Sequence, residues 1–146
     1  MFGDTGRIYV YFVYGSHYCF NIVAKDIDCS AGAILIRSVQ PIEGVNLMRI
    51  FRRTDNLMNL TSGPGKLTQA FKISEIHNGF DITANNNLFY LDDDIQENKN
   101  SNKFKVLETS RIGISSALEK KWRFIMLNPK ERSNEYITDP FVSKRG

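Results

Sequence analysis

The chain has 146 residues, of which 42% are hydrophobic and 24% are charged, which is enough for one globular domain with a core and too short to expect two. Its formal charge of +3 and sequence pI near 8.9 suit a polyanionic partner without requiring one. The chain contains neither a secretion signal nor a run of ~20 apolar residues that could span a membrane, so we expect a protein with reduced thiols in the cytoplasm, at a bacterial nucleoid, or in a nucleus.

The first forty residues carry the pattern of a small antiparallel sheet. Residues 7–13 and 17–23 are β-branched or aromatic almost without a break, and the tripeptide at 14–16, Tyr-Gly-Ser, supplies a turn. This pattern predicts a hairpin with both faces partly buried. Residues 33–39 repeat the signal until Pro41, which has no N–H to donate to a ladder. We expect the three strands to share one sheet.

Two helices are predicted after these strands. Pro41 suits a first helical turn, and apolar residues recur at spacings of three up to Phe51, so we expect a helix over residues 41–53. A second, short and amphipathic helix is expected to begin at Ser62, as its cap, and to run through Phe71.

The C-terminal part alternates polar stretches with short strands. Residues 85–87 and 96–103 are rich in Asn and Lys and should form loops, and residues 133–146 are expected to form a tail. The strand candidates are residues 87–91, 103–108 and 122–127.

The aromatic hairpin allows two interpretations. Its stacking surfaces beside polar tips suggest a ring-binding site. The alternative is that Tyr9, Tyr11, Phe12 and Tyr14 are ordinary sheet aromatics, with the tyrosine hydroxyls finding partners at the sheet edge. A strand His or Asn is also more often a hydrogen-bonded structural residue. Arg37 stands in an otherwise apolar run, where a charge is costly unless it is paired or functional.

Residues 62–67, Ser-Gly-Pro-Gly-Lys-Leu, place glycines at a helix start, where free N–H groups and Lys66 could grip a phosphate. The segment lacks the spacing of a nucleotide-binding P-loop, and a capped helix with a solvated lysine is the alternative. The cysteines and histidines show no ligand spacing, so we expect no metal and no cofactor. The acidic run Asp92-Asp93-Asp94 is typical of a solvated turn.

Residues 8–22, 33–37 and 62–67 together resemble the alkyladenine (3-methyladenine) DNA glycosylases, which flip damaged purines out of DNA. The resemblance extends over nearly the whole chain and is weakest across the Asn-rich loops. It implies a monofunctional enzyme of base-excision repair, monomeric and without cofactor, that hydrolyses the N-glycosidic bond of alkylated or deaminated purines in double-stranded DNA. It also implies an α+β fold over residues 1–146: a single mixed domain with a curved, mainly antiparallel sheet, flanking helices, and a hairpin that projects into the minor groove.

The resemblance assigns roles to hairpin residues. Tyr14, at the tip, falls on the position that intercalates into the duplex. Tyr11 aligns with a base-stacking tyrosine, and Tyr9 lies on the same face one alternation earlier. His17 matches an aromatic position of the base pocket, and Asn21 matches the amide that screens purines by clashing with the exocyclic amine of guanine.

Other roles fall outside the hairpin. Leu35 aligns with a residue next to the target base. Arg37 matches the arginine that holds the nucleophilic water together with a glutamate and a backbone carbonyl, which would belong to Ile112. DNA-backbone contact is implied for three residues of the glycine-rich segment: Ser62, Gly63 and Lys66.

The family's catalytic Glu lies in a segment before the hairpin, together with two of the three rings that clamp the base. This chain opens at Met1-Phe2-Gly3, which is similar to the family's lead-in to the hairpin, so we expect the general base to be absent from the chain. Three interpretations stay open: a complete glycosylase whose gene starts upstream, a fragment without activity, and a nucleic-acid-binding module that stacks on single strands.

Overall fold

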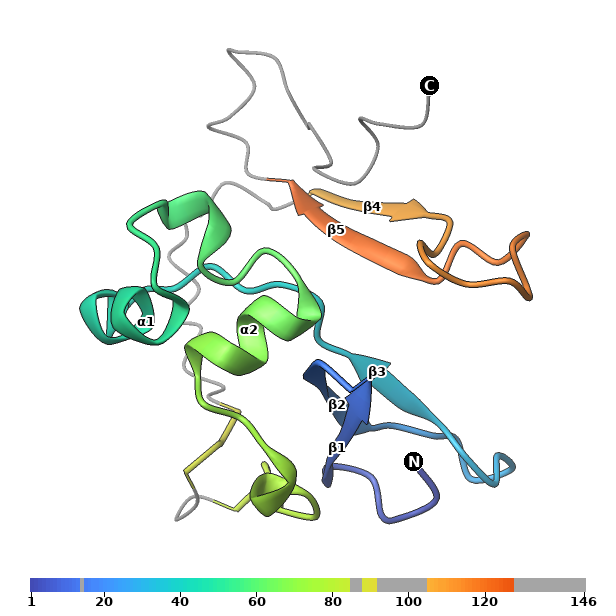
Figure 1. Cartoon of the computed structure of the whole chain (residues 1–146). Helices are drawn as coiled ribbons and strands as arrows, with labels where there is room; N and C mark the ends of the chain where they lie inside the picture. Colours follow the sequence, from blue (N-terminus) through green and yellow to red (C-terminus); the bar gives the residue numbers. More distant parts are fainter. Residues whose placement is uncertain (14, 85–87, 92–104, 128–146) are drawn as a thin grey trace, which may run out of the picture. The chain divides into compact units, whose positions relative to one another are not determined.

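The computed structural model describes residues 1–13, 15–84, 88–91 and 105–127 (Figure 1). The chain divides into two compact units, Met1–Asp93 and Asp94–Gly146. The predictions of a single domain over residues 1–146 and of a monomer therefore stay predictions. Several other predictions lie outside the described residues: those for Tyr14, the loops at 85–87 and 96–103, Asp92-Asp93-Asp94, and the tail at 133–146.

The first unit is built on the predicted three-stranded sheet. Strands β1 (Ile8–Val13), β2 (His17–Val23) and β3 (Ala33–Leu35) pair antiparallel in the order β1-β2-β3. The hairpin is confirmed to within one residue. β3 is four residues shorter than predicted. Ile36 still donates a backbone hydrogen bond to Phe20, but the Val39 carbonyl accepts from the Thr61 hydroxyl and not from β2.

The first helix, α1 (Val45–Arg52), is confirmed, but its predicted start at Pro41 is wrong. Gly44 precedes the helix with a φ of 69°, a left-handed conformation that a continuous right-handed helix cannot contain. Ile42, expected on the buried face, therefore lies outside the helix with an exposed fraction of 89%. Met48 is the buried residue of α1.

The second helix, α2 (Pro64–Ala70), has proline in its first turn, as expected. The predicted cap at Ser62 is wrong, because Gly63 is the N-cap residue and no side chain caps the helix. The Ser62 hydroxyl instead accepts a hydrogen bond from the Lys66 ammonium group at 3.1 Å. Two short 3₁₀ helices, η1 (Leu57–Asn59) and η2 (Glu75–His77), were not predicted.

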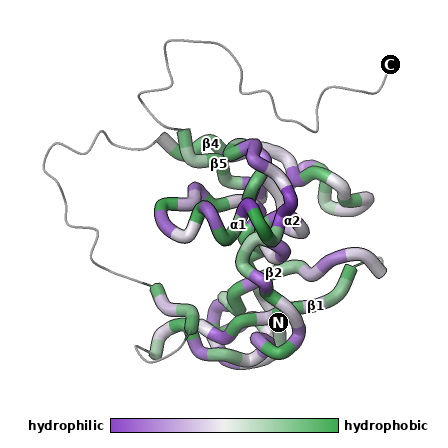
Figure 2. Tube along the Cα trace, turned by 60° about the vertical axis from the view of Figure 1, so that its left-hand side comes forward, coloured by the Kyte–Doolittle hydropathy of each residue, from purple (hydrophilic) through white to green (hydrophobic). Residues whose placement is uncertain are grey.

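The core of the first unit lies between the sheet and α2. Its largest cluster contains Ile8, Val10 and Phe20 from the hairpin and Leu67 from α2. Because side chains alternate along a strand, the even-numbered residues of β1 and β2 face α2, whereas Tyr9, Tyr11, Cys19 and Asn21 lie on the opposite face. A hydrogen bond of 3.0 Å from the Thr68 hydroxyl to the Tyr18 carbonyl ties α2 to β2. Figure 2 shows polar and apolar residues interspersed along the helices, as expected for elements that bury one face.

The second unit contains an antiparallel pair, β4 (Lys105–Thr109) and β5 (Arg123–Leu127), which confirms two predicted strands to within two residues at each end. The strand predicted over residues 87–91 is wrong for residues 88–91, where Leu91 makes a single backbone hydrogen bond to Ile82. The predicted α+β class, with antiparallel sheets and flanking helices, is confirmed. No described helix is long and apolar enough to cross a membrane.

The packing of α2 on β2 predicts a cost for a methyl group at Gly65. A Cβ atom there would lie 2.7 Å from Cγ and Cδ2 of the His17 ring. We expect Gly65→Ala to destabilise the fold by about 1–3 kcal/mol through overpacking, measured by thermal or urea unfolding. In a His17→Ala background the same change should become neutral or stabilising, because alanine is the better helix former. An equal loss in both backgrounds would contradict this packing.

Candidate functional site

One row of side chains crosses the sheet on the face opposite α2. Tyr9 pairs with Asn21, and Asn21 pairs with Leu35 in the next strand. Residues directly opposite each other in an antiparallel sheet point to the same face. The structure therefore brings together three of the residues predicted to line the base pocket.

Two tyrosine rings extend this row along β1. Tyr9 and Tyr11 stack with 5.3 Å between ring centroids and 30° between ring planes. The exposed fraction of Tyr11 is 41%, although the large apolar ring of a tyrosine is usually buried. The pair forms a flat surface on which a planar ligand can stack.

Asn21 is fixed in the middle of this face. Its exposed fraction is 5%, and its amide nitrogen donates to the carbonyl oxygens of Tyr9 at 3.0 Å and Cys19 at 3.3 Å. One sequence interpretation was a structural asparagine whose side chain is hydrogen-bonded by the backbone. The two hydrogen bonds of the amide nitrogen agree with that interpretation. Both contacts hold the side chain in one orientation.

Arg37 lies near the same face through its neighbour Cys19. Burial raises the pKa of the Cys19 thiol, because desolvation disfavours the thiolate, while a hydrogen bond with Tyr11 and the positive charge of Arg37 act in the opposite direction. Arg37 is half-buried, two residues after Leu35. The electrostatic effect of Arg37 on this thiol and the hydrogen bond of Tyr11 are the links between Cys19 and two predicted site residues.

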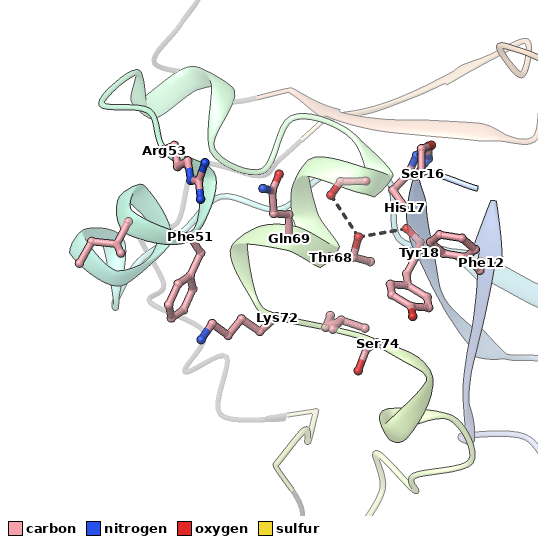
Figure 3. Close-up of a pocket in the computed structure, with 13 residues that line it drawn as sticks. Phe12, Ser16, His17, Tyr18, Phe51, Arg53, Thr68, Gln69, Lys72 and Ser74 are labelled. Atoms are coloured by element: carbon pink, nitrogen blue, oxygen red, sulfur yellow. Dashed lines mark hydrogen bonds between the residues drawn. The ribbon is translucent and has the colours of Figure 1, made fainter. Parts of the chain in front are cut away.

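His17 has different neighbours from the other predicted pocket residues. Its ring lies against Gly65 of α2, and its Nδ1 is 2.8 Å from the Ser16 hydroxyl. Figure 3 shows Ser16 and His17 beside the start of α2. A role for His17 in the base pocket stays a prediction.

The residues predicted to contact the DNA backbone lie at the start of α2. Gly63 is buried, and the Lys66 ammonium group donates to Asn59 Oδ1 at 3.0 Å as well as to Ser62. Two of the three N–H donors of Lys66 are therefore used by internal acceptors, which leaves one for a phosphate. Ile112 belongs to the second unit, where Gly113 follows it with a φ of 73°. Its predicted role beside Arg37 stays a prediction.

An open cavity of about 630 Å³, which the sequence interpretation missed, lies on the α2 side of the hairpin (Figure 3). Its walls come from the hairpin, the C-terminal end of α1, and α2 with the residues that follow. The lining residues are Phe12, Ser16, His17, Tyr18, Ile50, Phe51, Arg53, Gly65, Thr68, Gln69, Lys72, Ile73 and Ser74. The sequence did contain a signal for this cavity. Phe12 and Tyr18 alternate with the tyrosines of the opposite face, so they had to lie on a second face of the hairpin.

The comparisons with known proteins point to one family. The family model for methylpurine-DNA glycosylase (MPG) matches residues 1–130. Proteins named "Putative 3-methyladenine DNA glycosylase" are similar over nearly the whole chain. The relative in Prosthecochloris aestuarii is 41% identical, with 99% of this chain and 61% of the relative covered. The relative in Francisella tularensis subsp. tularensis is 40% identical, with 99% of this chain and 68% of the relative covered. The chain thus spans between three fifths and about two thirds of their length.

The neighbourhood of Cys19 predicts its reactivity. We expect a thiol-specific reagent to modify exposed Cys29 well before buried Cys19. Arg37→Ala should slow Cys19 further, because the thiol pKa rises when the positive charge is removed, whereas Arg37→Lys should not. The measurement is the labelling rate of each cysteine at pH 8 by mass spectrometry. A faster Cys19 in Arg37→Ala would place the guanidinium elsewhere or indicate a loosened fold.

Proposed function

The chain belongs to the methylpurine-DNA glycosylase family, and on this premise we propose that it acts in DNA base-excision repair, on double-stranded DNA that contains an alkylated or deaminated purine. The observation that supports the proposal is the single face on which Tyr9, Tyr11, Asn21 and Leu35 lie. Base excision requires a flipped base to be held against a flat apolar surface and read at its polar edge. The proposed face offers both features.

In this proposal the flipped purine stacks on the Tyr11 ring, which Tyr9 supports from behind. Stacking of a base on an aromatic side chain is worth about 1–3 kcal/mol, which offsets part of the few kcal/mol needed to remove the base from the duplex. Tyr14, at the hairpin tip, would fill the gap that the base leaves. Asn21 would reject guanine, because its side chain is held too firmly by two backbone carbonyls to move away from an exocyclic amine.

Arg37 would position the nucleophilic water beside this base, together with the carbonyl of Ile112. N-glycosidic bond hydrolysis passes through an oxocarbenium-like state, and the water must lose a proton to a general base. A guanidinium group remains protonated at neutral pH and can orient the water but not accept that proton. The proton must therefore pass to a general base other than Arg37, and under the proposal the family's glutamate is not among residues 1–146.

A single-strand-binding module remains the second candidate, since stacked tyrosines accept any base. The two candidates differ in their preferred nucleic acid. A repair protein prefers a duplex with a lesion, and a stacking module prefers single strands without regard to damage.

The first test is equilibrium binding to duplexes with and without one hypoxanthine or ethenoadenine, and to the matching single strands. We expect preference for the damaged duplex, and about a 5- to 150-fold loss of that affinity in Tyr14→Ala, equivalent to ~1–3 kcal/mol of stacking. Tyr90→Ala is the matched control, because Tyr90 is an exposed tyrosine of the first unit to which the proposal gives no role. Tighter binding to single strands, with no preference for damage, would support the stacking module instead.

The second test is base release with protein in excess over damaged duplex. We expect release to be slower by about 10²–10⁴-fold than for the longer Francisella relative, because the general base contributes a factor of this size. A rate equal to that of the relative would show that a carboxylate of this chain serves as the base. In that case Arg37→Ala should abolish release while binding is retained.

A further inference from the structure

Both α-helices of the first unit, α1 and α2, are followed by a basic residue in a left-handed conformation. Arg53 follows α1 with a φ of 49°, and Lys72 follows α2 and Phe71 with a φ of 53°. Glycine or asparagine usually occupies such positions, because the Cβ atom of other residues approaches the following carbonyl. Helix termination alone does not explain why basic residues occupy these two strained backbone positions.

Both side chains line the cavity between the hairpin, α1 and α2, although they come from different helices (Figure 3). Lys72 is held with its ammonium nitrogen 4.2 Å from the centroid of the Phe51 ring, and both basic residues are exposed. The neighbouring acid, Glu75, accepts a hydrogen bond from the Tyr18 hydroxyl. The cavity thus joins two cations with the hydroxyl, imidazole and amide groups of Ser16, His17 and Gln69.

This cavity and the base-binding face lie on opposite sides of one hairpin. Core residues Val10 and Phe20 mark the α2 side, and Tyr9, Tyr11 and Asn21 mark the other. A hairpin that enters a groove of the duplex has one phosphate backbone on each side of it. If the base-binding face meets the damaged strand, the α2 side faces the backbone of the other strand.

We propose that the cavity between the hairpin and the C-terminal ends of α1 and α2 binds backbone phosphates of duplex DNA, with Arg53 and Lys72 as their counter-ions. The inference rests on the proposed function and names a DNA contact for it. Lys66 already donates to Asn59 and Ser62, whereas Arg53 and Lys72 line an open cavity with polar groups on its wall. A guanidinium fork suits two phosphate oxygens, and an ammonium group supplies a point charge.

Glycine substitutions separate this role from a purely structural one. Lys72→Gly and Arg53→Gly each remove a cation and also relieve the left-handed strain, so the melting temperature should be unchanged or higher. If the cations only complemented the helix dipoles, the same variants would leave DNA binding unchanged. Ala117→Gly is the matched control, because Ala117 has a φ of 53° in the second unit and carries no charge.

The measurement is fluorescence anisotropy with an undamaged duplex over a series of KCl concentrations. We expect each glycine variant to bind more weakly and the slope of log K against log salt to become shallower by ~0.9 per cation, and by ~1.8 in the double variant. Ala117→Gly and the charge-conserving Lys72→Arg should keep the wild-type slope. An unchanged slope in the folded double variant would overturn the inference, as would saturable binding of inorganic phosphate at these cations with no effect on DNA.

The outcome is distinguishable from a failure of the proposed function. The double variant should lose affinity for damaged and undamaged duplexes by the same factor, so that the preference for the lesion is kept. A wild-type chain that prefers lesions and a variant with unchanged slope would refute the cavity alone. A wild-type chain that does not bind duplex DNA would refute both.

Discussion

The antiparallel register between β1 and β2 is the constraint on which the rest of the first unit depends. It places Tyr9 opposite Asn21, and therefore decides which side chains of the hairpin face α2 and which face away. A shift of one residue would exchange the two sets, burying tyrosine hydroxyls and exposing isoleucine and valine. The register is held from both sides, because apolar residues of β1 and β2 pack on Leu67 while the Asn21 amide bonds to two carbonyls of the hairpin.

The hairpin thus has one stabilised face and one face left available. On its α2 side, Ile8, Val10 and Phe20 are buried in the core, and this burial supplies the hydrophobic free energy that holds the strands. A hydrogen bond from Thr68 ties the same side to α2. The other side carries stacked tyrosines, one of them exposed, beside a fixed amide and a nearby arginine. Such a division suits a binding surface, since a rigid scaffold positions its groups before the ligand arrives.

The sequence predicted the elements whose pattern is local and missed the features that depend on distant contacts. Strong β-propensity and a turn were enough for β1 and β2, and Pro64 was enough for the start of α2. The start of α1 was misplaced because the left-handed conformation of Gly44 cancels the signal of Pro41. The resemblance supplied the site residues of the tyrosine face, whereas nothing in the pattern of Arg53 or Lys72 predicts a left-handed backbone.

Under the proposed function, the two faces of the hairpin divide affinity from selectivity. Phosphate contacts carry no information about sequence or damage, so cations on the α2 side raise the affinity for any duplex. This contribution to the affinity falls as the salt concentration rises. Selectivity must then come from groups that cannot adapt, and Asn21 is such a group because the backbone fixes its orientation. A mobile side chain would make room for guanine by moving away, whereas a fixed one keeps a steric clash with its exocyclic amine. Asn21 resembles an ordinary strand residue because the backbone holds its amide. Under the proposal, the same hydrogen bonds allow it to discriminate against guanine.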